Sequence, residues 1–314
     1  MSQNNFHHIS VLLKEAVEGL RVRDGYTYVD CTTGSGSHSF QIAQRMGQNG
    51  RLICIDRDKN ALEAAKKRLV VFEDRITFVH ENFTELGNIL DSLNVDNLGG
   101  VLMDLGCSSP QFDTPERGFS YMHDAPLDMR MNEEDTLTAY DVVNEYSESK
   151  LKEIIYEYGE ERFASRIASF IVNAREKSPI KTTGELSDII KSAIFASARA
   201  DGPHPAKRTF QAIRIEVNKE LDAIAPAMKA AANRLVAGGR LSIISFHSLE
   251  DRIVKNTISD LSSGCTCPKD FPICVCNKKP TLKQVNKKPI LPSAEELENN
   301  PRSRSAKLRL AEKL

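Results

Sequence analysis

Short apolar segments alternate with segments of helical spacing over the first 105 residues, and this alternation restricts the fold more than any other feature of the sequence. The apolar segments have the length and composition of β-strands and cover residues 26–30, 51–56, 76–80 and 100–105. Strands that alternate with helices form right-handed βαβ units, in which the strands are parallel. We therefore predict an α/β fold with a mainly parallel sheet that is covered by helices on both faces.

A further helix is expected before the first strand. It carries an apolar stripe over residues 11–20, with Ser10 as its predicted N-cap and Asp24-Gly25 as its end.

The pattern changes to helices alone from about residue 114. A capping-box pattern of Thr182 and Glu185 predicts the N-terminus of one of these helices. The α/β pattern then resumes with a helix that holds Val217 to Met228, the turn Gly238-Gly239 and a strand over 240–246. We predict a discontinuous α/β domain of residues 1–113 and 216–314 with a helical insertion of residues 114–215. Its second part includes a Cys/Lys-rich loop over 262–300 and a final strand over 306–311.

Composition excludes some classes of protein. Lys and Arg number 42 against 43 Asp and Glu, so the formal net charge is −1 and a nucleic acid would have to meet a local basic patch. No apolar run approaches the ~20 residues of a membrane helix, and the N-terminus lacks the pattern of a signal peptide. We expect a cytoplasmic protein without a membrane partner. Seven cysteines, an odd number, favour reduced thiols over a disulfide framework.

The first strand runs into a turn that contains Gly34 and Gly36, and helical spacing resumes directly after it. Glycine permits positive φ and close approach of a ligand to the backbone, and the turn would present a helix N-terminus at the end of the strand. The pattern predicts a ligand cradle, although a strand, a glycine turn and a helix also occur as a plain connection.

Asp56 closes the second strand, 20 residues after Gly36. At this spacing a carboxylate accepts hydrogen bonds from the ribose of a nucleotide-like cofactor. The third glycine of a dinucleotide fingerprint is replaced by Ser39, so the loop suits a ligand without a pyrophosphate, and S-adenosylmethionine fits. The alternative is that Asp56 caps a helix, a role for which Asp58 is equally placed.

The segment Asp104–Gln111 follows the fourth strand and should open over the same edge of the sheet. It is similar to the Asp/Asn-Pro-Pro-aromatic loop of amino-group methyltransferases. The amino lone pair of cytosine or adenine is conjugated into the ring, so acceptors for its N–H groups would favour in-line attack on a methyl carbon. The alternative is a Ser/Pro turn capped by Asp104.

Nine motifs in this order resemble those of the bacterial 16S rRNA cytosine-N4 methyltransferase family, also called RsmH or MraW. They are His8–Leu13, Gly34–Ser39, Ile55–Asp58, Asp104–Gln111, Glu116–Ser120, Pro126–Met131, Tyr158–Phe163, His204–Arg214 and Ser242–Arg252. The resemblance implies a Rossmann-like class I S-adenosylmethionine-dependent methyltransferase fold with an inserted all-helical, substrate-recognition domain. It also implies S-adenosylmethionine as the methyl donor and a cytosine in the decoding region of 16S rRNA as the substrate.

The resemblance also assigns cofactor contacts. By position these are Gly36, Ser37, His38, Asp56, Phe83, Asp104 and Gln111. Phe83 offers an apolar face to adenine. Where the family reads G-x-G-G-H-S, this chain has Ser37 in place of a glycine, and its Cβ restricts φ. For methyl transfer itself we predict Asp104 and the loop Ser108, Ser109 and Pro110.

Predicted RNA contacts lie near the end of the helical insertion and after the strand 240–246. Lys207, Arg208 and Arg214, with His204 and Phe210, form a basic and aromatic pattern suited to phosphates and a stacked base. Phe210 and Ile213 also lie on an apolar stripe and fit a core. His247 either borders the active site or belongs to a helix capped through Ser248 and Asp251.

Four cysteines lie within twelve residues near the C-terminus. Cys265, Cys267, Cys274 and Cys276 could close a structural zinc site, although zinc-binding pairs more often have two residues between the cysteines. Cys107 is interpreted as a buried thiol, because an exocyclic nitrogen needs no covalent activation.

The sequence therefore predicts direct in-line transfer of a methyl group to the N4 amine of a cytosine, with the small ribosomal subunit as partner and either a monomer or a homodimer as the active form. A nicotinamide-dependent oxidoreductase is disfavoured by Ser39. An RNA-binding ribosome assembly factor that keeps the fold without essential catalysis is the remaining alternative.

Overall fold

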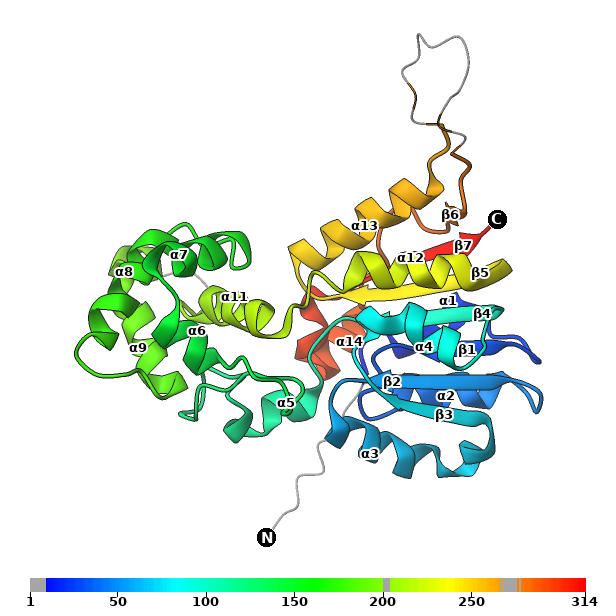
Figure 1. The fold of residues 1–314 in the computed structure, drawn as a ribbon, viewed down its shortest axis with the longest axis horizontal. Helices are drawn as coiled ribbons and strands as arrows, with labels where there is room; N and C mark the ends of the chain where they lie inside the picture. The colour runs from blue at the N-terminus through cyan, green and yellow to red at the C-terminus, as the bar shows by residue number, and fades with distance from the viewer. Residues whose placement is uncertain (1–9, 200–203, 266, 268–275, 277) are drawn as a thin grey trace. The chain divides into compact units, whose positions relative to one another are not determined.

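The computed structural model describes residues 10–199, 204–265, 267, 276 and 278–314. The chain divides into two compact units (Figure 1), one formed by Met1–Gly106 and Leu221–Leu314 and the other by Cys107–Glu220. The predicted boundaries lay at 113/114 and 215/216. The second boundary differs because the helix that contains residue 215 continues to Asn218 and belongs to the core of the helical unit.

The first unit is built on a seven-stranded sheet in the order β3-β2-β1-β4-β5-β7-β6. Its strands are β1 Thr27–Asp30, β2 Arg51–Asp56, β3 Ile76–His80, β4 Leu98–Asp104, β5 Leu235–Ser245, β6 Leu282–Gln284 and β7 Lys307–Lys313. Strands β1 to β5 are parallel, whereas β7 runs antiparallel to both of its neighbours. The predicted α/β fold with a mainly parallel sheet is confirmed. The strand order reverses between β1 and β4, and in open α/β sheets ligands bind beyond the carboxyl ends of the strands at this point.

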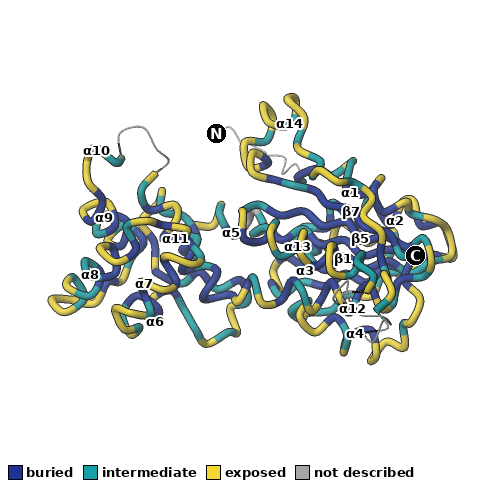
Figure 2. Tube along the Cα trace, turned by 90° about the horizontal axis from the view of Figure 1, so that it is seen from above, coloured by how far each residue is buried: buried dark blue, intermediate teal, exposed yellow. Residues whose placement is uncertain are grey.

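Helices cover both faces of this sheet. They are α1 Leu13–Leu20, α2 Ser37–Arg45, α3 Lys59–Leu69, α4 Leu86–Ser92, α12 Ile224–Arg234 and α13 Ser248–Ser262. The unit also contains the short helix α14 Ala294–Asn299, which has no buried residue. Alternate residues of β2 enter different cores: Leu52 and Cys54 pack with α1, α2 and α3, while Ile53 and Ile55 pack with α4, α12 and α13. The central strands are consequently buried on both sides (Figure 2).

The second unit consists of helices around a core of its own. These are α5 Ser109–Asp113, α6 Ala139–Glu145, α7 Glu148–Glu157, α8 Ala164–Arg175, α9 Thr183–Ala193, α10 Ala196–Arg199 and α11 Lys207–Asn218. The predicted capping box is confirmed, since the Thr182 hydroxyl accepts a hydrogen bond from the Glu185 backbone and the Glu185 carboxylate accepts one from the Thr182 backbone. Short 3-10 segments are η1 Val70–Arg75 and η2 Phe83–Glu85 in the first unit, η3 Pro115–Arg117 in the second and η4 Pro301–Ser305 in the first.

A bilayer-spanning helix would need both length and apolar content, and none of the helices in the described ranges has both.

The predicted cap and end of the first helix are wrong. Helix α1 starts at Leu13, and its N-cap is Leu12. Leu12 has a left-handed backbone conformation, and its side chain forms no hydrogen bond to the helix. The Leu12 N–H donates instead to Glu296 Oε1 at 2.8 Å, a partner 284 residues away that local sequence does not reveal. The helix ends before Arg21, which is also left-handed, rather than at Asp24-Gly25.

Two further predictions are corrected near the return to the sheet. The helix expected over Val217 to Met228 is two helices, because Lys219 adopts a left-handed conformation with φ 51° and ends α11. The turn expected at Gly238-Gly239 lies inside β5, where the pairing with β4 shifts from Leu98↔Leu235 to Gly100↔Arg240. The irregularity is thus a break in register within one strand and not a turn before it.

Two elements inside the loop predicted over 262–300 were missed. Strand β6 has three residues and forms by pairing with the end of β7, and α14 has six residues. Segments this short carry no periodic signal of their own.

A buried ion pair joins the antiparallel strands to the rest of the first unit. Arg240 donates through Nε and Nη2 to Glu312 Oε2 at 3.0 and 2.7 Å, and through Nη1 to the Gly19 carbonyl at 3.0 Å. Lys283 Nζ lies 2.7 Å from Glu312 Oε1. The hydrogen bonds from Lys283 and Arg240 lower the pKa of Glu312 to about 2. One carboxylate therefore links β5, β6 and β7.

We expect Glu312→Gln to lower the free energy of unfolding by about 2–3 kcal/mol at neutral pH, because it leaves buried Arg240 without its counter-ion. Since folding depresses the pKa of Glu312, the wild-type advantage is fully present above 4.5 and is lost as pH falls toward 2. Urea unfolding of both proteins across this pH range measures the difference. The exposed Glu298→Gln is the matched control and should match wild type; a Glu312→Gln deficit that is independent of pH would contradict the electrostatic account.

Candidate active site

Three neighbouring strands of the first unit each end in an aspartate. Asp30 ends β1, Asp56 ends β2 and Asp104 ends β4, and these strands are adjacent in the order β2-β1-β4. Because the strands are parallel, the three carboxyl groups lie at one edge of the sheet. Sequence analysis selected Asp56 and Asp104 but missed Asp30, although its position at the end of a strand was a visible signal. Asp30 is fully buried and accepts a hydrogen bond from Ser39 Oγ at 2.6 Å.

Asp56 holds the glycine turn in place. Its Oδ2 accepts a hydrogen bond from the Gly34 N–H at 2.7 Å, and its Oδ1 accepts one from the Asp58 N–H at 2.9 Å. The N-cap of α3 is Asp58, whose side chain binds the Asn60 N–H, so the alternative role of Asp56 as the helix cap is wrong. Burial raises the pKa of Asp56 to about 6. The carboxylate thus joins the second strand to the loop after the first.

The glycine turn has the conformation that its sequence predicts. Gly34 and Gly36 have φ of 52° and 82°, and Gly36 is the N-cap of α2. A Cβ at Gly36 would approach Ala65 of α3 to 3.2 Å, whereas a Cβ at Gly34 would meet nothing closer than the Thr32 carbonyl at 4.0 Å. Gly36 therefore permits the packing of two helices, and Gly34 leaves open space beside the loop.

Ser37, the residue that departs from the family pattern, fits this turn. It is the first residue of α2 and is not among the residues with positive φ, so its Cβ does not strain the backbone. Arg68 donates a hydrogen bond to its hydroxyl.

Asp104 is partly buried, and one of its carboxylate oxygens is buried without a partner. Its N–H donates to Thr32 Oγ1 at 2.6 Å, and its Oδ2 lies 3.9 Å from Nδ1 of buried His38, whose Nε2 is 3.2 Å from the Val11 carbonyl. Its Oδ1 has no hydrogen-bond partner within the described ranges. Burial, together with the charges of Asp30 and Glu250, raises the pKa of Asp104 to about 8. A cation at this position would relieve both the desolvation and the repulsion.

Glu250 is a second acidic residue that acts on the charge of Asp104. It is 1% exposed, and its Oε2 accepts hydrogen bonds from the backbone N–H groups of Phe246 and His247 at 2.7 and 3.2 Å. His247 is the N-cap of α13 and accepts the Glu250 N–H. The predicted cap through Ser248 and Asp251 is therefore wrong. Asp251 instead binds Arg309 Nε at 2.6 Å, and that pairing lowers its pKa despite burial.

The other predicted cofactor residues lie in both units. Phe83 starts η2 and packs, partly buried, against the core that contains α4. In the helical unit, Gln111 is buried and its Oε1 accepts a hydrogen bond from the Ser108 N–H at 3.0 Å. Gln111 thus closes the loop at Ser108, while the Asp104 carboxylate accepts a hydrogen bond from the Gly106 backbone, as the capped-turn alternative expects. Ser109 and Pro110 start α5. The cofactor and catalytic roles of these residues stay predictions.

The predicted RNA residues on α11 separate into two groups. Lys207 and Arg208 are exposed, and Arg208 Nη1 donates to the Glu160 carbonyl at 2.9 Å. Arg214 is mostly buried and forms two hydrogen bonds of 2.8 Å with Glu220.

In the aromatic part of that pattern, Phe210 is internal and His204 is exposed. Phe210 and Ile213 are buried in the core, as the alternative interpretation held, and the His204 ring stacks on Tyr121 with centroids 4.5 Å apart. Only Lys207 and Arg208 of the predicted cluster thus present exposed positive charge.

Comparison with known proteins identifies the family. A model of the MraW methylase family matches residues 5–314. The chain belongs to the MraW methylase family. A curated relative from Brevibacillus brevis, ribosomal RNA small subunit methyltransferase H, is 55% identical over the full length of both chains. Relatives of the same name from Clostridioides difficile and Symbiobacterium thermophilum are 55% and 56% identical, and the alignments cover 98% of this chain and 99% and 97% of theirs.

Membership of the MraW methylase family confirms that the protein is a methyltransferase with the class I S-adenosylmethionine-dependent fold. The residues at the strand ends fit such a cofactor. S-adenosylmethionine carries a sulfonium and an ammonium group, and the carboxyl groups of Asp30, Asp104 and Glu250 supply negative charge around the buried, unpartnered Oδ1 of Asp104. The open space beside Gly34 leaves room at the loop. The turn, Asp56 and Asp104 are the groups that would hold the cofactor.

We expect Asp104→Asn to stabilise the protein without cofactor by about 1–3 kcal/mol near pH 9, because it removes a buried charge. Folding raises the pKa of Asp104, so wild type loses stability as pH rises from 3.8 through about 8, and the two proteins should converge at low pH. Asp56→Asn is the matched comparison: an amide has one acceptor for two backbone N–H groups, which should cost about 1–3 kcal/mol. Thermal unfolding at several pH values measures both effects, and an Asp104→Asn protein that is less stable than wild type near pH 9 would refute the assignment.

Proposed function

We propose that this protein transfers a methyl group from S-adenosylmethionine to the exocyclic N4 amine of a cytosine in the decoding region of 16S rRNA. Family membership and the names of the relatives, which specify the small-subunit ribosomal RNA, support the substrate class. The observation that carries the chemistry is the unpartnered, buried oxygen of Asp104. We place the reaction in the cytoplasm, where ribosomal subunits assemble.

S-adenosylmethionine, when bound, supplies an electrophilic methyl group on a positively charged sulfur. In the α/β unit, the carboxyl groups of Asp30, Asp104 and Glu250 stabilise positive charge at the strand ends. A bound cation favours the ionised form of Asp104, whose raised pKa otherwise keeps it protonated near neutral pH. Ionised Asp104 is then an acceptor for an N–H group of the substrate amine.

Acceptance of one amine hydrogen orients the nitrogen for attack, and the buried surroundings favour a step in which the sulfonium charge is neutralised. The target cytosine has to leave its stack to reach a buried site. We assign recognition of the RNA to the helical unit, with Lys207 and Arg208 as its exposed phosphate contacts.

The direct test incubates the protein with labelled S-adenosylmethionine and with small subunits or 16S rRNA from cells that lack this gene. We expect N4-methylcytidine at a decoding-region cytosine, identified by mass spectrometry of nuclease fragments. Asp104→Ala should reduce kcat/KM by at least about 100-fold while RNA binding is retained.

Glu298→Gln, an exposed substitution on α14, is the activity control and should behave as wild type. Intact protein that binds RNA but forms no N4-methylcytidine on any assembly intermediate would favour the non-catalytic assembly factor. Full activity of Asp104→Ala would remove Asp104 from the site.

Substitution of the exposed cations on α11 should weaken RNA binding through charge alone. We expect Lys207→Ala and Arg208→Ala each to reduce the slope of log affinity against log salt by about 0.7–1. Lys152→Ala, an exposed substitution on α7 of the same unit, is the matched control and should leave the slope unchanged. Filter binding with 16S rRNA fragments over a salt series measures this, and equal slopes for all four proteins would exclude these residues as phosphate contacts.

A further inference from the structure

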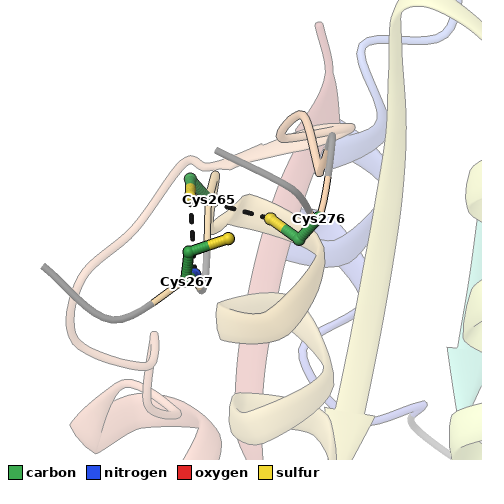
Figure 3. Close-up of side chains that lie close together, drawn as sticks. All are labelled: Cys265, Cys267 and Cys276. Carbon is green, nitrogen blue, oxygen red and sulfur yellow. Dashed lines mark hydrogen bonds between the residues drawn. The ribbon is translucent and has the colours of Figure 1, made fainter. Parts of the chain in front are cut away.

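Three cysteine thiols converge in the connection between α13 and β6. The Sγ atoms of Cys265, Cys267 and Cys276 all lie within 4.8 Å of one another, and Figure 3 shows the side chains gathered from the two ends of the connection. The Cys276 thiol donates to Cys265 Sγ at 3.6 Å, far longer than the ~2.05 Å of a disulfide. None of the three is in a disulfide. Methyl transfer, as described above, uses none of them.

The spacing of the sulfur atoms matches a tetrahedral metal site. Zinc binds thiolates at about 2.3 Å, so two thiolates on one tetrahedral zinc lie ~3.8 Å apart. The distance of 3.6 Å between Cys265 and Cys276 is close to that edge length. A metal ion would take the place of the proton now shared between these sulfur atoms.

A backbone hydrogen bond also favours a thiolate at this position. The Cys267 N–H donates to Cys265 Sγ at 3.4 Å. Such donors stabilise negative charge on a ligating sulfur and orient it. The contact therefore places a backbone donor at the sulfur atom that a metal ion would bind.

The ends of the connection are already fastened to the α/β unit. Lys278 Nζ binds Asp260 Oδ1 at 2.6 Å and Ser263 Oγ at 3.2 Å, and the Thr281 N–H donates to the Leu261 carbonyl at 2.8 Å. These contacts hold the base of the connection and bring Cys265 near Cys276. A metal ion there would join Cys265 to Cys276, next to ends of the connection that polar contacts already hold together.

The cluster lies away from the proposed catalytic residues. Helix α13 starts just after the carboxyl end of β5 and runs back along the sheet for 15 residues, roughly 22 Å at 1.5 Å per residue. Figure 1 shows the C-terminus of α13 at the edge of the sheet opposite the strand ends that carry Asp30, Asp56 and Asp104, and Cys265 follows that C-terminus by three residues. A metal held there would be structural.

We propose that Cys265, Cys267 and Cys276 bind a zinc ion that closes the connection between α13 and β6. Binding displaces the thiol protons, and the thiolates coordinate the ion. Cys274, the fourth cysteine of the sequence prediction, lies outside the described residues, and the proposal rests on the other three.

The test measures metal in the full-length protein, purified under reducing conditions, by inductively coupled plasma mass spectrometry. We expect about one zinc per chain in wild type and less than about a tenth of that in Cys265→Ser and Cys276→Ser. Cys107→Ser is the matched control, because it removes a thiol from the other unit, and should retain the zinc. The readout does not depend on methyl transfer, so failure of this proposal and failure of the proposed function are distinguishable.

A second measurement needs no cysteine variant and therefore does not depend on their folding. Wild-type protein stripped with a chelator and loaded with Co²⁺ should show thiolate-to-cobalt charge-transfer absorption and the intense visible bands of tetrahedral cobalt. The stripped protein should also be cleaved faster by trypsin after Lys278, since Pro280 blocks cleavage after Lys279. Protein that lacks zinc and gives no such cobalt spectrum would overturn the proposal, as would Cys265→Ser protein with full zinc content or a disulfide between Cys265 and Cys276 in freshly purified protein.

Discussion

Burial of the central strands on both faces is the constraint on which the rest of the α/β unit depends. Alternate residues of β2 enter two separate cores, so neither face of the strand is available for polar side chains. Polar groups are consequently concentrated where the strands end. There, Asp56 binds the Gly34 N–H and thereby joins two neighbouring strand ends in a single loop geometry. The same concentration places the carboxyl groups of Asp30 and Asp104 close enough for each to raise the energy of the other's charge.

This crowding of acids destabilises the protein without a ligand and favours the binding of a cationic one. A carboxyl group with an unpartnered oxygen gains more from a positive charge than a solvated one does, because it has already lost its water. The opposite solution appears in β7, where Glu312 has three cationic partners, Arg21, Arg240 and Lys283, and a pKa of about 2. Two acids in one unit thus differ by their partners: Glu312 completes a structural ion pair, and Asp104 keeps an oxygen available for a ligand.

Prediction from sequence succeeded where the signal was local. The strands, the glycine turn and the Thr182–Glu185 capping box each depend on residues a few positions apart, and all three are present. It failed where a distant partner decides the conformation. The start of α1 depends on Glu296, and the short strand β6 depends on β7. The basic pattern on α11 was overestimated because sequence does not reveal that Glu220 engages Arg214.

The sequence by itself determined the α/β alternation, the family and two of the aspartates at the strand ends, Asp56 and Asp104, because hydrophobic periodicity and motif order depend on residues that are close together in the chain. Only the tertiary structure decided which of those acids lack partners, how Ser37 fits its turn, and that Cys265 and Cys276 meet although ten residues separate them. The physical reason is that burial, charge repulsion and convergence of thiols are properties of groups brought together by chain folding. Spacing along the chain specifies which groups can meet, and packing specifies which of them do.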